Sequence, residues 1–275
     1  MKYRRGISAS FFIIMFCLCS LQDSPAVTAS VSSGDIRRIG DMVFRNECSG
    51  KEELLVNWNE GEDFLSLGIG HFIWYPATDV KDFIESFPLF LRYAKDSGAE
   101  IPGWLGRNLS RPCPWNTRDE FLRSQDDPRL IELRRFLIST KLVQARFIVK
   151  RLDDALPIML KNVPEEDRGG ISARFGRLSL SRSGAFAMVD YINFKGLGIS
   201  PSERYNGKGW GLTQVLLNMK EDNAANDTLK EFVNAAKRTL EERVNNAPPG
   251  RNEKKWLAGW QNRVESYLYN IKAGR

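Results

Sequence analysis

Residues 60–72 read EGEDFLSLGIGHF, and this stretch carries the strongest indication of the fold. It begins with acidic, polar residues around a glycine, which predict a loop. Aromatic and β-branched residues at 64–75 then predict a strand or hairpin. In an extended segment Ser66, Gly68 and Gly70 lie on one face, because side chains alternate between the two sides of a strand. Since glycine weakens a strand, two of them on one face favour a bare surface that a ligand can approach closely.

A helix is predicted before this segment, over residues 33–45, where apolar residues recur at Ile36, Ile39 and Val43. One further step along the stripe is Glu47, so its carboxyl is expected on the apolar face at the end of the helix. Burial among apolar neighbours disfavours the charged form of a carboxyl group, and this prepares Glu47 to donate a proton. The alternative is a helix-end glutamate that extends into water.

The acidic loop offers a second carboxylate. Glu60, Glu62 and Asp63 lie in polar sequence, where a carboxylate stays ionised. Trp74 continues the predicted strand and is a candidate to stack on a sugar ring. One protonated carboxyl, such as Glu47, and one ionised carboxylate are what glycoside hydrolysis requires. The alternative is a bulged hairpin with a charged turn.

The remainder of the chain is mainly helical. Residues 185–193 are apolar almost all round, which is typical of a central buried helix. Helical apolar patterns also occur at residues 130–159, 212–219, 229–244 and 256–271. Several helices and one small β element predict an α+β fold that is predominantly α.

Composition and charge restrict the classes of function. The chain has 275 residues, of which 42% are hydrophobic and 27% charged, as in a globular protein, and its formal net charge of +6 suggests attraction to anionic polymers. Basic and acidic residues alternate and no run of five basic residues occurs, which argues against a nucleic-acid-binding protein. His71 is the only histidine, and the sequence has neither a recognisable catalytic triad nor a cluster of metal ligands. No metal or cofactor is therefore expected.

The first 29 residues have the pattern of a secretory signal peptide. Basic residues precede a short apolar run at 11–21, and small residues lead to a cleavage point after Ala29. The run is too short to span a bilayer comfortably, so a retained membrane anchor is the less favoured alternative. Cleavage would leave residues 30–275 with a formal net charge of about +4. We expect an exported protein, periplasmic or extracellular, without a stable membrane anchor.

Two cysteines, Cys48 and Cys113, remain after cleavage. An oxidising compartment makes a disulfide between them plausible, and two buried free thiols are the alternative.

The segment from Glu47 to His71 resembles the catalytic segment of the phage-type lysozymes, which are endolysins and muramidases of the lysozyme-like superfamily. That family has a glutamate at a helix end, an aspartate in a hairpin, a threonine, and then a G-x-G-H strand. Glu47 takes the place of the catalytic glutamate, Glu60 that of the aspartate and Ser66 that of the threonine. The remaining matches are direct: Gly68, Gly70 and His71.

Two weaker matches follow in the family's order. MVDYINFKGLG at 188–198 is similar to a buried helix that ends in an F-N-x-G turn. PPGRNEKKWLAGW at 248–260 resembles the closing turn and C-terminal helix. The chain departs from the family in having Glu for Asp and Ser for Thr, and in a longer stretch between the two acids. The region 76–140 is also larger than the family core requires.

The resemblance implies a single lysozyme-like domain, with a small β-hairpin lobe, a helical lobe and a cleft between them. It implies cleavage of peptidoglycan glycan strands with inversion. Glu47 would protonate the glycosidic oxygen, and Glu60, assisted by Ser66, would orient or activate water. Asn193 and Trp74 are candidates for sugar contacts, beside the cleft residues Gly68, Gly70 and His71.

Three alternatives stay open. A lytic transglycosylase would need only Glu47, and Glu62 or Asp63 could replace Glu60 as the second acid of a hydrolase. A chitosanase-like enzyme is disfavoured, because a basic protein is a poor host for a cationic polymer. A non-catalytic wall-binding protein would keep the cleft without the chemistry.

Overall fold

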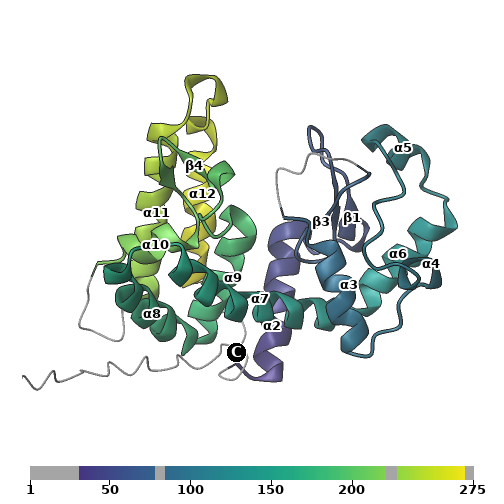
Figure 1. The fold of residues 1–275 in the computed structure, drawn as a ribbon, viewed down its shortest axis with the longest axis horizontal. Helices are drawn as coiled ribbons and strands as arrows, with labels where there is room; N and C mark the ends of the chain where they lie inside the picture. The colour runs from purple at the N-terminus through teal and green to yellow at the C-terminus, as the bar shows by residue number, and fades with distance from the viewer. Residues whose placement is uncertain (1–30, 78–83, 221–227, 270–275) are drawn as a thin grey trace, which may run out of the picture.

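The computed structural model describes residues 31–77, 84–220 and 228–269. The predicted signal peptide at 1–29 lies outside these residues. The described chain forms two lobes joined by the long helix α7 (Lys141–Lys161) (Figure 1). Within it, no helix is long and apolar enough to cross a membrane.

The first lobe begins with helix α2 (Ser33–Cys48), whose apolar residues pack into the core as the stripe predicts. The Ser32 side chain accepts a hydrogen bond from the Asp35 amide and so satisfies a free donor at the start of the helix. The helix ends because Ser49 has φ 51°, a left-handed conformation that cannot continue it.

A three-stranded antiparallel sheet in the order β1-β2-β3 follows α2. Its strands are β1 (Val56–Asn57), β2 (Leu65–Leu67) and β3 (Phe72–Trp74). The predicted β segment is therefore a hairpin, in which Ser66 pairs with Ile73. The chain turns at residues 68–71, since Gly68 has φ +69° and His71 has φ 46°. The expectation of extended backbone through Gly70 is wrong for this reason.

The short helix η1 and four helices from the enlarged region complete this lobe. They are η1 (Glu52–Leu55), α3 (Phe87–Asp96), α4 (Gly103–Gly106), α5 (Arg118–Arg123) and α6 (Pro128–Ser139). Stacked aromatic rings join this region to the sheet, as between Phe72 and Phe90, whose ring centroids are 4.9 Å apart. The helix predicted over 130–159 is divided into α6 and α7 at Thr140, whose φ of −101° and ψ of 13° depart from helical values.

The helix α7 packs closely on α2. A Cβ atom at Gly40 of α2 would lie 2.6 Å from the Ala145 Cβ of α7, so only glycine permits this approach. Apolar residues of both lobes contribute to one continuous core.

The second lobe is helical. Its elements are α8 (Glu165–Ser179), α9 (Arg182–Lys195), η2 (Pro201–Glu203), the two-stranded sheet β4 (Arg204–Tyr205) and β5 (Lys208–Gly209), α10 (Leu212–Asn218), α11 (Thr228–Asn246), η4 (Pro249–Arg251), α12 (Lys254–Glu265) and η5 (Ser266–Leu268). The central helix α9 is buried on nearly every side, as its apolar sequence predicts. The molecule is thus α+β and predominantly helical, which confirms the coarse class.

Candidate active-site cleft

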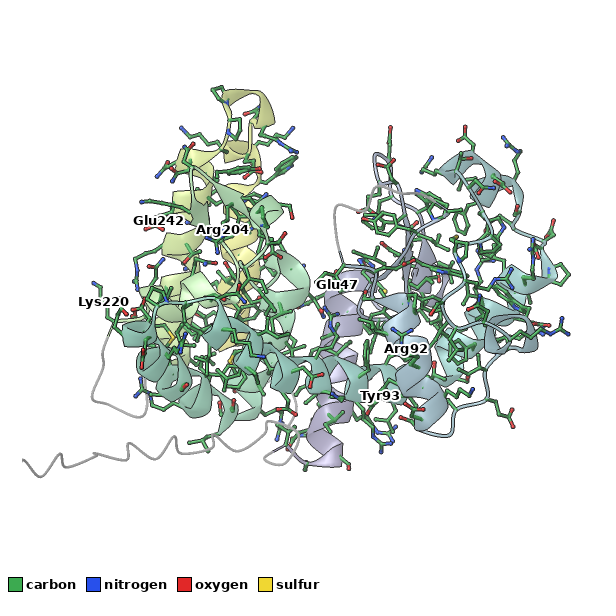
Figure 2. The ribbon with its side chains drawn as sticks, in the orientation of Figure 1. Glu47, Arg92, Tyr93, Arg204, Lys220 and Glu242 are labelled. Atoms are coloured by element: carbon green, nitrogen blue, oxygen red, sulfur yellow. The ribbon has the colours of Figure 1, made fainter. Side chains whose placement is uncertain are left out.

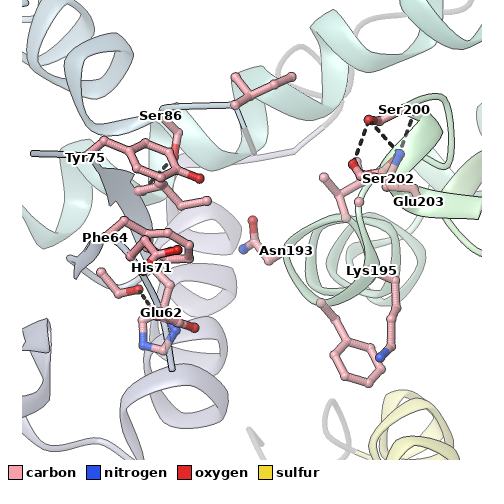
Figure 3. A pocket seen from close by; sticks show the side chains of 18 of the residues that line it. Glu62, Phe64, His71, Tyr75, Ser86, Asn193, Lys195, Ser200, Ser202 and Glu203 are labelled. Atoms are coloured by element: carbon pink, nitrogen blue, oxygen red, sulfur yellow. Dashed lines mark hydrogen bonds between the residues drawn. The ribbon is translucent and has the colours of Figure 1, made fainter. Parts of the chain in front are cut away.

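A cleft with a volume of about 1310 Å³ is lined by residues of both lobes. One wall comes from the hairpin and the enlarged region, and includes Glu62, His71 and Asn116. The opposite wall comes from the end of α9 and from α11 and its neighbours, and includes Asn193 and Lys195. Figure 3 shows these two walls facing each other across the open space.

Glu47 lies in the last turn of α2, between the two lobes (Figure 2), and lines the cleft. Its side chain is 12% exposed. One carboxylate oxygen, Oε1, accepts from the Arg263 guanidinium of α12. The other, Oε2, lies 3.3 Å from His71 Nδ1. The surroundings of Glu47 are therefore not the apolar ones expected from the helical stripe, but a cation and the only histidine.

Arg263 is shared between Glu47 and a second carboxylate, Asp190 of α9, which is fully buried. Asp190 Oδ2 accepts from Arg263 Nε at 2.9 Å and from the Tyr267 hydroxyl at 2.6 Å. Its Oδ1 accepts from Arg263 Nη2 at 2.9 Å and from the Asn46 amide at 3.0 Å. Two carboxylates thus face one guanidinium, and Asp190 makes the more complete contact with it.

The charges in this network explain its pKa shifts. Burial lowers the pKa of Arg263, but the hydrogen bonds and negative charge of Asp190, with the charge of Glu47, outweigh burial and raise it overall. Burial, followed by the charge of Asp190, raises the pKa of the Tyr267 hydroxyl well above its ordinary value. Arg263 is consequently a permanent cation and Tyr267 a permanent hydrogen-bond donor.

The sequence analysis missed both Asp190 and Arg263. Asp190 is the only charged residue in the apolar segment 185–193, which is the signal that could have revealed it. A charged side chain in a helix that is buried on all sides requires a partner, because burying a charge without an ion pair or hydrogen bonds costs free energy. Nothing in the sequence indicates that the partner lies in α12.

The structure separates the three candidates for the second acid. Glu60 is exposed and does not line the cleft, whereas Glu62 and Asp63 do. Glu62 Oε2 accepts from the Asn59 amide at 3.0 Å and from the Ser66 hydroxyl at 3.4 Å. The carboxylate that Ser66 supports is therefore Glu62 and not Glu60.

The glycines of the G-x-G-H motif make room for neighbouring side chains and do not leave a bare surface for a ligand. The space beside Gly68 is filled by the side chain of Gln144 from α7, whose Oε1 accepts from the Ile69 amide at 2.8 Å. A Cβ atom at Gly70 would lie 2.8 Å from the Phe72 ring and 2.9 Å from Ile148. The expected bare strand face is wrong, because α7 packs against the turn, although Gly70 still lines the cleft.

The two candidates for sugar contacts have different positions. Trp74 is fully buried, its ring packs against Phe87, and its Nε1 donates to the Arg111 carbonyl at 2.9 Å. It has no surface left for a sugar, so that prediction is wrong. Asn193 lines the cleft, and its Nδ2 is a buried atom that has no hydrogen-bond partner in the described part of the chain. Figure 3 shows this amide directed into the space between the walls.

The predicted disulfide is also wrong, since Cys48 and Cys113 are both free and buried. The Cys48 thiol faces the carbonyl oxygens of Leu54 and Gly68, each 3.8 Å away. Cys113 lies elsewhere, where its amide donates to the Tyr75 carbonyl beside the hairpin. Burial raises the pKa of both thiols to about 12, so both remain protonated and unreactive while the protein is folded.

No group of three or more His, Cys, Asp or Glu side chains capable of holding a metal ion occurs among the described residues. No known protein-family model matches the chain, and neither does any curated protein sequence or any solved structure. What the cleft can do is therefore inferred from its own side chains.

Proposed function

We propose that the protein is an exported glycoside hydrolase that cleaves the glycan strands of peptidoglycan, with Glu47 as the general acid. One observation carries the proposal: a carboxyl at a helix end, Glu47, and a second carboxylate, Glu62, line the same cleft between two lobes. Glycoside hydrolysis uses two such groups, one on each side of the scissile bond. The signal-peptide pattern at 1–29 supports export.

The proposed reaction begins with transfer of the Glu47 proton to the glycosidic oxygen. Asp190 contributes to this step by neutralising Arg263. A guanidinium paired with Glu47 alone would favour the carboxylate and oppose protonation, but Asp190 already compensates most of its charge. Arg263 can then orient the Glu47 carboxyl and stabilise the carboxylate that forms when the proton leaves.

Glu62 is proposed to act on water at the opposite face of the sugar. The hydrogen bonds from Asn59 and Ser66 both end on Oε2, which leaves Oε1 available to accept a proton from water. Asn193, on the other wall, is proposed to contact a sugar hydroxyl or acetamido group. Its Nδ2 is buried and has no hydrogen-bond partner among the described residues, so this contact requires the amide to turn toward the sugar.

The experiment is muropeptide release from purified peptidoglycan by the full-length exported protein and three variants. Glu47→Gln keeps the shape of the side chain but has no proton to transfer, so its rate should fall by at least about 10²-fold. Glu62→Gln should also lose activity. Its matched control is Glu60→Gln, an exposed glutamate of the same loop, which should keep wild-type activity. Circular dichroism confirms equal folding.

Each other outcome has a distinct meaning. Wild-type activity in Glu47→Gln would remove Glu47 from the mechanism. Activity lost in Glu60→Gln but kept in Glu62→Gln would reverse the assignment of the second acid. Dependence on Glu47 alone, with anhydro-sugar products, would identify a lytic transglycosylase. An inactive wild-type protein that still binds peptidoglycan would be a wall-binding protein.

A further inference from the structure

The wall of the cleft opposite the hairpin contains a lysine that the proposed reaction does not use. Lys195 is the last residue of α9 and is only 9% exposed. Its Nζ lies 3.5 Å from the centre of the Trp260 ring and 4.0 Å from that of Phe194. Within the described chain, Lys195 makes no ion pair or hydrogen bond. Yet it lines the cleft, as Figure 3 shows.

The carboxylates of this wall are already engaged. Glu253 accepts from Arg243 Nε at 2.7 Å, from Arg243 Nη2 at 2.8 Å and from the Tyr205 hydroxyl at 2.9 Å. One oxygen of Glu203 accepts from the backbone amides of residues 198–200, at 2.6, 3.0 and 3.3 Å. Neither carboxylate forms an ion pair with Lys195.

Three further basic side chains line the cleft without an ion pair in the described structure, and one of them, Arg118 of α5, donates from Nε to the Trp58 carbonyl at 3.0 Å. Arg251 lies in η4, at the same wall, and Arg151 lies on α7. Burial lowers the pKa of Arg151, with no carboxylate opposing the effect. With Lys195, four basic side chains without an ion pair in the described structure thus line one cavity, and an anion that entered it would gain the interactions that the protein does not supply.

We propose that Lys195, supported by Arg251, forms a subsite for a carboxylate carried by the glycan substrate. The inference rests on the proposed function and extends it, because it distinguishes between glycans that share one sugar backbone. Peptidoglycan strands carry carboxylates on the lactyl group of muramic acid or on the attached peptide. Chitin oligosaccharides have the same β-1,4-linked N-acetylated backbone without a carboxylate.

The surroundings of Lys195 make this subsite sensitive to pH. Burial, and after it the charge of Arg243, lowers the pKa of Lys195 to about 6; Glu253 opposes the shift and Arg263 adds to it. The empty subsite therefore holds largely neutral amine at pH 7. A bound carboxylate favours the ammonium form, so binding takes up a proton. Carboxylate binding should weaken as pH rises from 5 to 8.

The experiment measures binding apart from cleavage, by calorimetry with full-length Glu47→Gln protein. The probes are a peptide-free peptidoglycan tetrasaccharide with lactyl carboxylates, the same tetrasaccharide with its peptides, and chitotetraose. Lys195→Met removes the charge and keeps the apolar stem against Trp260 and Phe194. Lys230→Met, an exposed lysine of α11 outside the cleft, is the matched control.

Lys195→Met should bind at least one carboxylate-bearing tetrasaccharide roughly tenfold more weakly. Its affinity for chitotetraose should equal that of the Lys195 protein, and Lys230→Met should change neither. Loss with the peptide-free probe identifies the lactyl group as the source of the carboxylate, and loss only with the peptide-bearing probe identifies the peptide. Equal affinity for all three probes, unchanged in Lys195→Met, would overturn the subsite while the glycosidase proposal stands. If no probe binds and wild-type protein releases no muropeptide, the proposed function fails and the subsite with it.

Discussion

Replacing Asp190 by asparagine keeps the size of a fully buried side chain and removes its charge. The two carboxylate oxygens accept four hydrogen bonds, two of them from Arg263. An asparagine has one acceptor oxygen, so its amide group would face either Arg263 Nε or the donors at the other oxygen position. At least one charged donor is then left without its acceptor.

The expected cost follows from this geometry. Breaking a buried ion pair by removing one partner costs about 3–5 kcal/mol. Glu47 still faces Arg263 in the variant, and one acceptor oxygen remains, so we expect the lower end, about 3 kcal/mol of unfolding free energy. The control is Tyr267→Phe, which removes one hydrogen bond to Asp190 and no charge, and which should cost about 1 kcal/mol.

The assay is urea unfolding at pH 7, followed by circular dichroism, on wild-type protein and both variants. A loss below about 1 kcal/mol for Asp190→Asn would refute the view that Asp190 is the principal counter-ion of Arg263. In the folded variant, muropeptide release should also fall, because Arg263, which positions the Glu47 carboxyl, loses contacts with Asp190 that hold it in place.

Two further results are expected. The pKa of Lys195 is about 6 in the folded protein, below its ordinary value of 10.5. From about pH 6 upward, Lys195 therefore binds fewer protons in the folded state than in the unfolded state, and folding becomes more favourable as pH rises. Lys195 thus destabilises the folded protein most at low pH. The free energy of unfolding of Lys195→Met minus that of wild type should therefore decrease by up to about 1.4 kcal/mol per pH unit between pH 6 and 8. Urea unfolding at each pH measures this difference. A difference that does not change with pH would contradict the low pKa. Cys48 and Cys113 should both react with Ellman's reagent in urea without reductant and resist it in the native protein, whereas absence of reaction in urea would mean that they are oxidised.

Several elements of the site could be predicted from local sequence. The stripe of Ile36, Ile39 and Val43 places Glu47 at a helix end, because helical periodicity depends only on neighbouring residues. The acidic loop and hairpin at 60–75 and the buried helix at 185–193 are confirmed for the same reason. The sequence alone therefore determined the helical class of the fold, the hairpin and the position of Glu47 on its helix.

The partners of these residues depend on contacts between distant segments. Arg263 meets Glu47 across 216 positions, and Gln144 fills the space beside Gly68 across 76 positions. No periodicity encodes such a meeting, since it arises when whole helices pack. Trp74 and Cys113 show the same limit: their residue types suggested a sugar contact and a disulfide, but packing of the enlarged region buries both. Only the tertiary structure decided that Glu62, not Glu60, lines the cleft, and that Lys195 lines it without an ion pair to any residue that the structure describes.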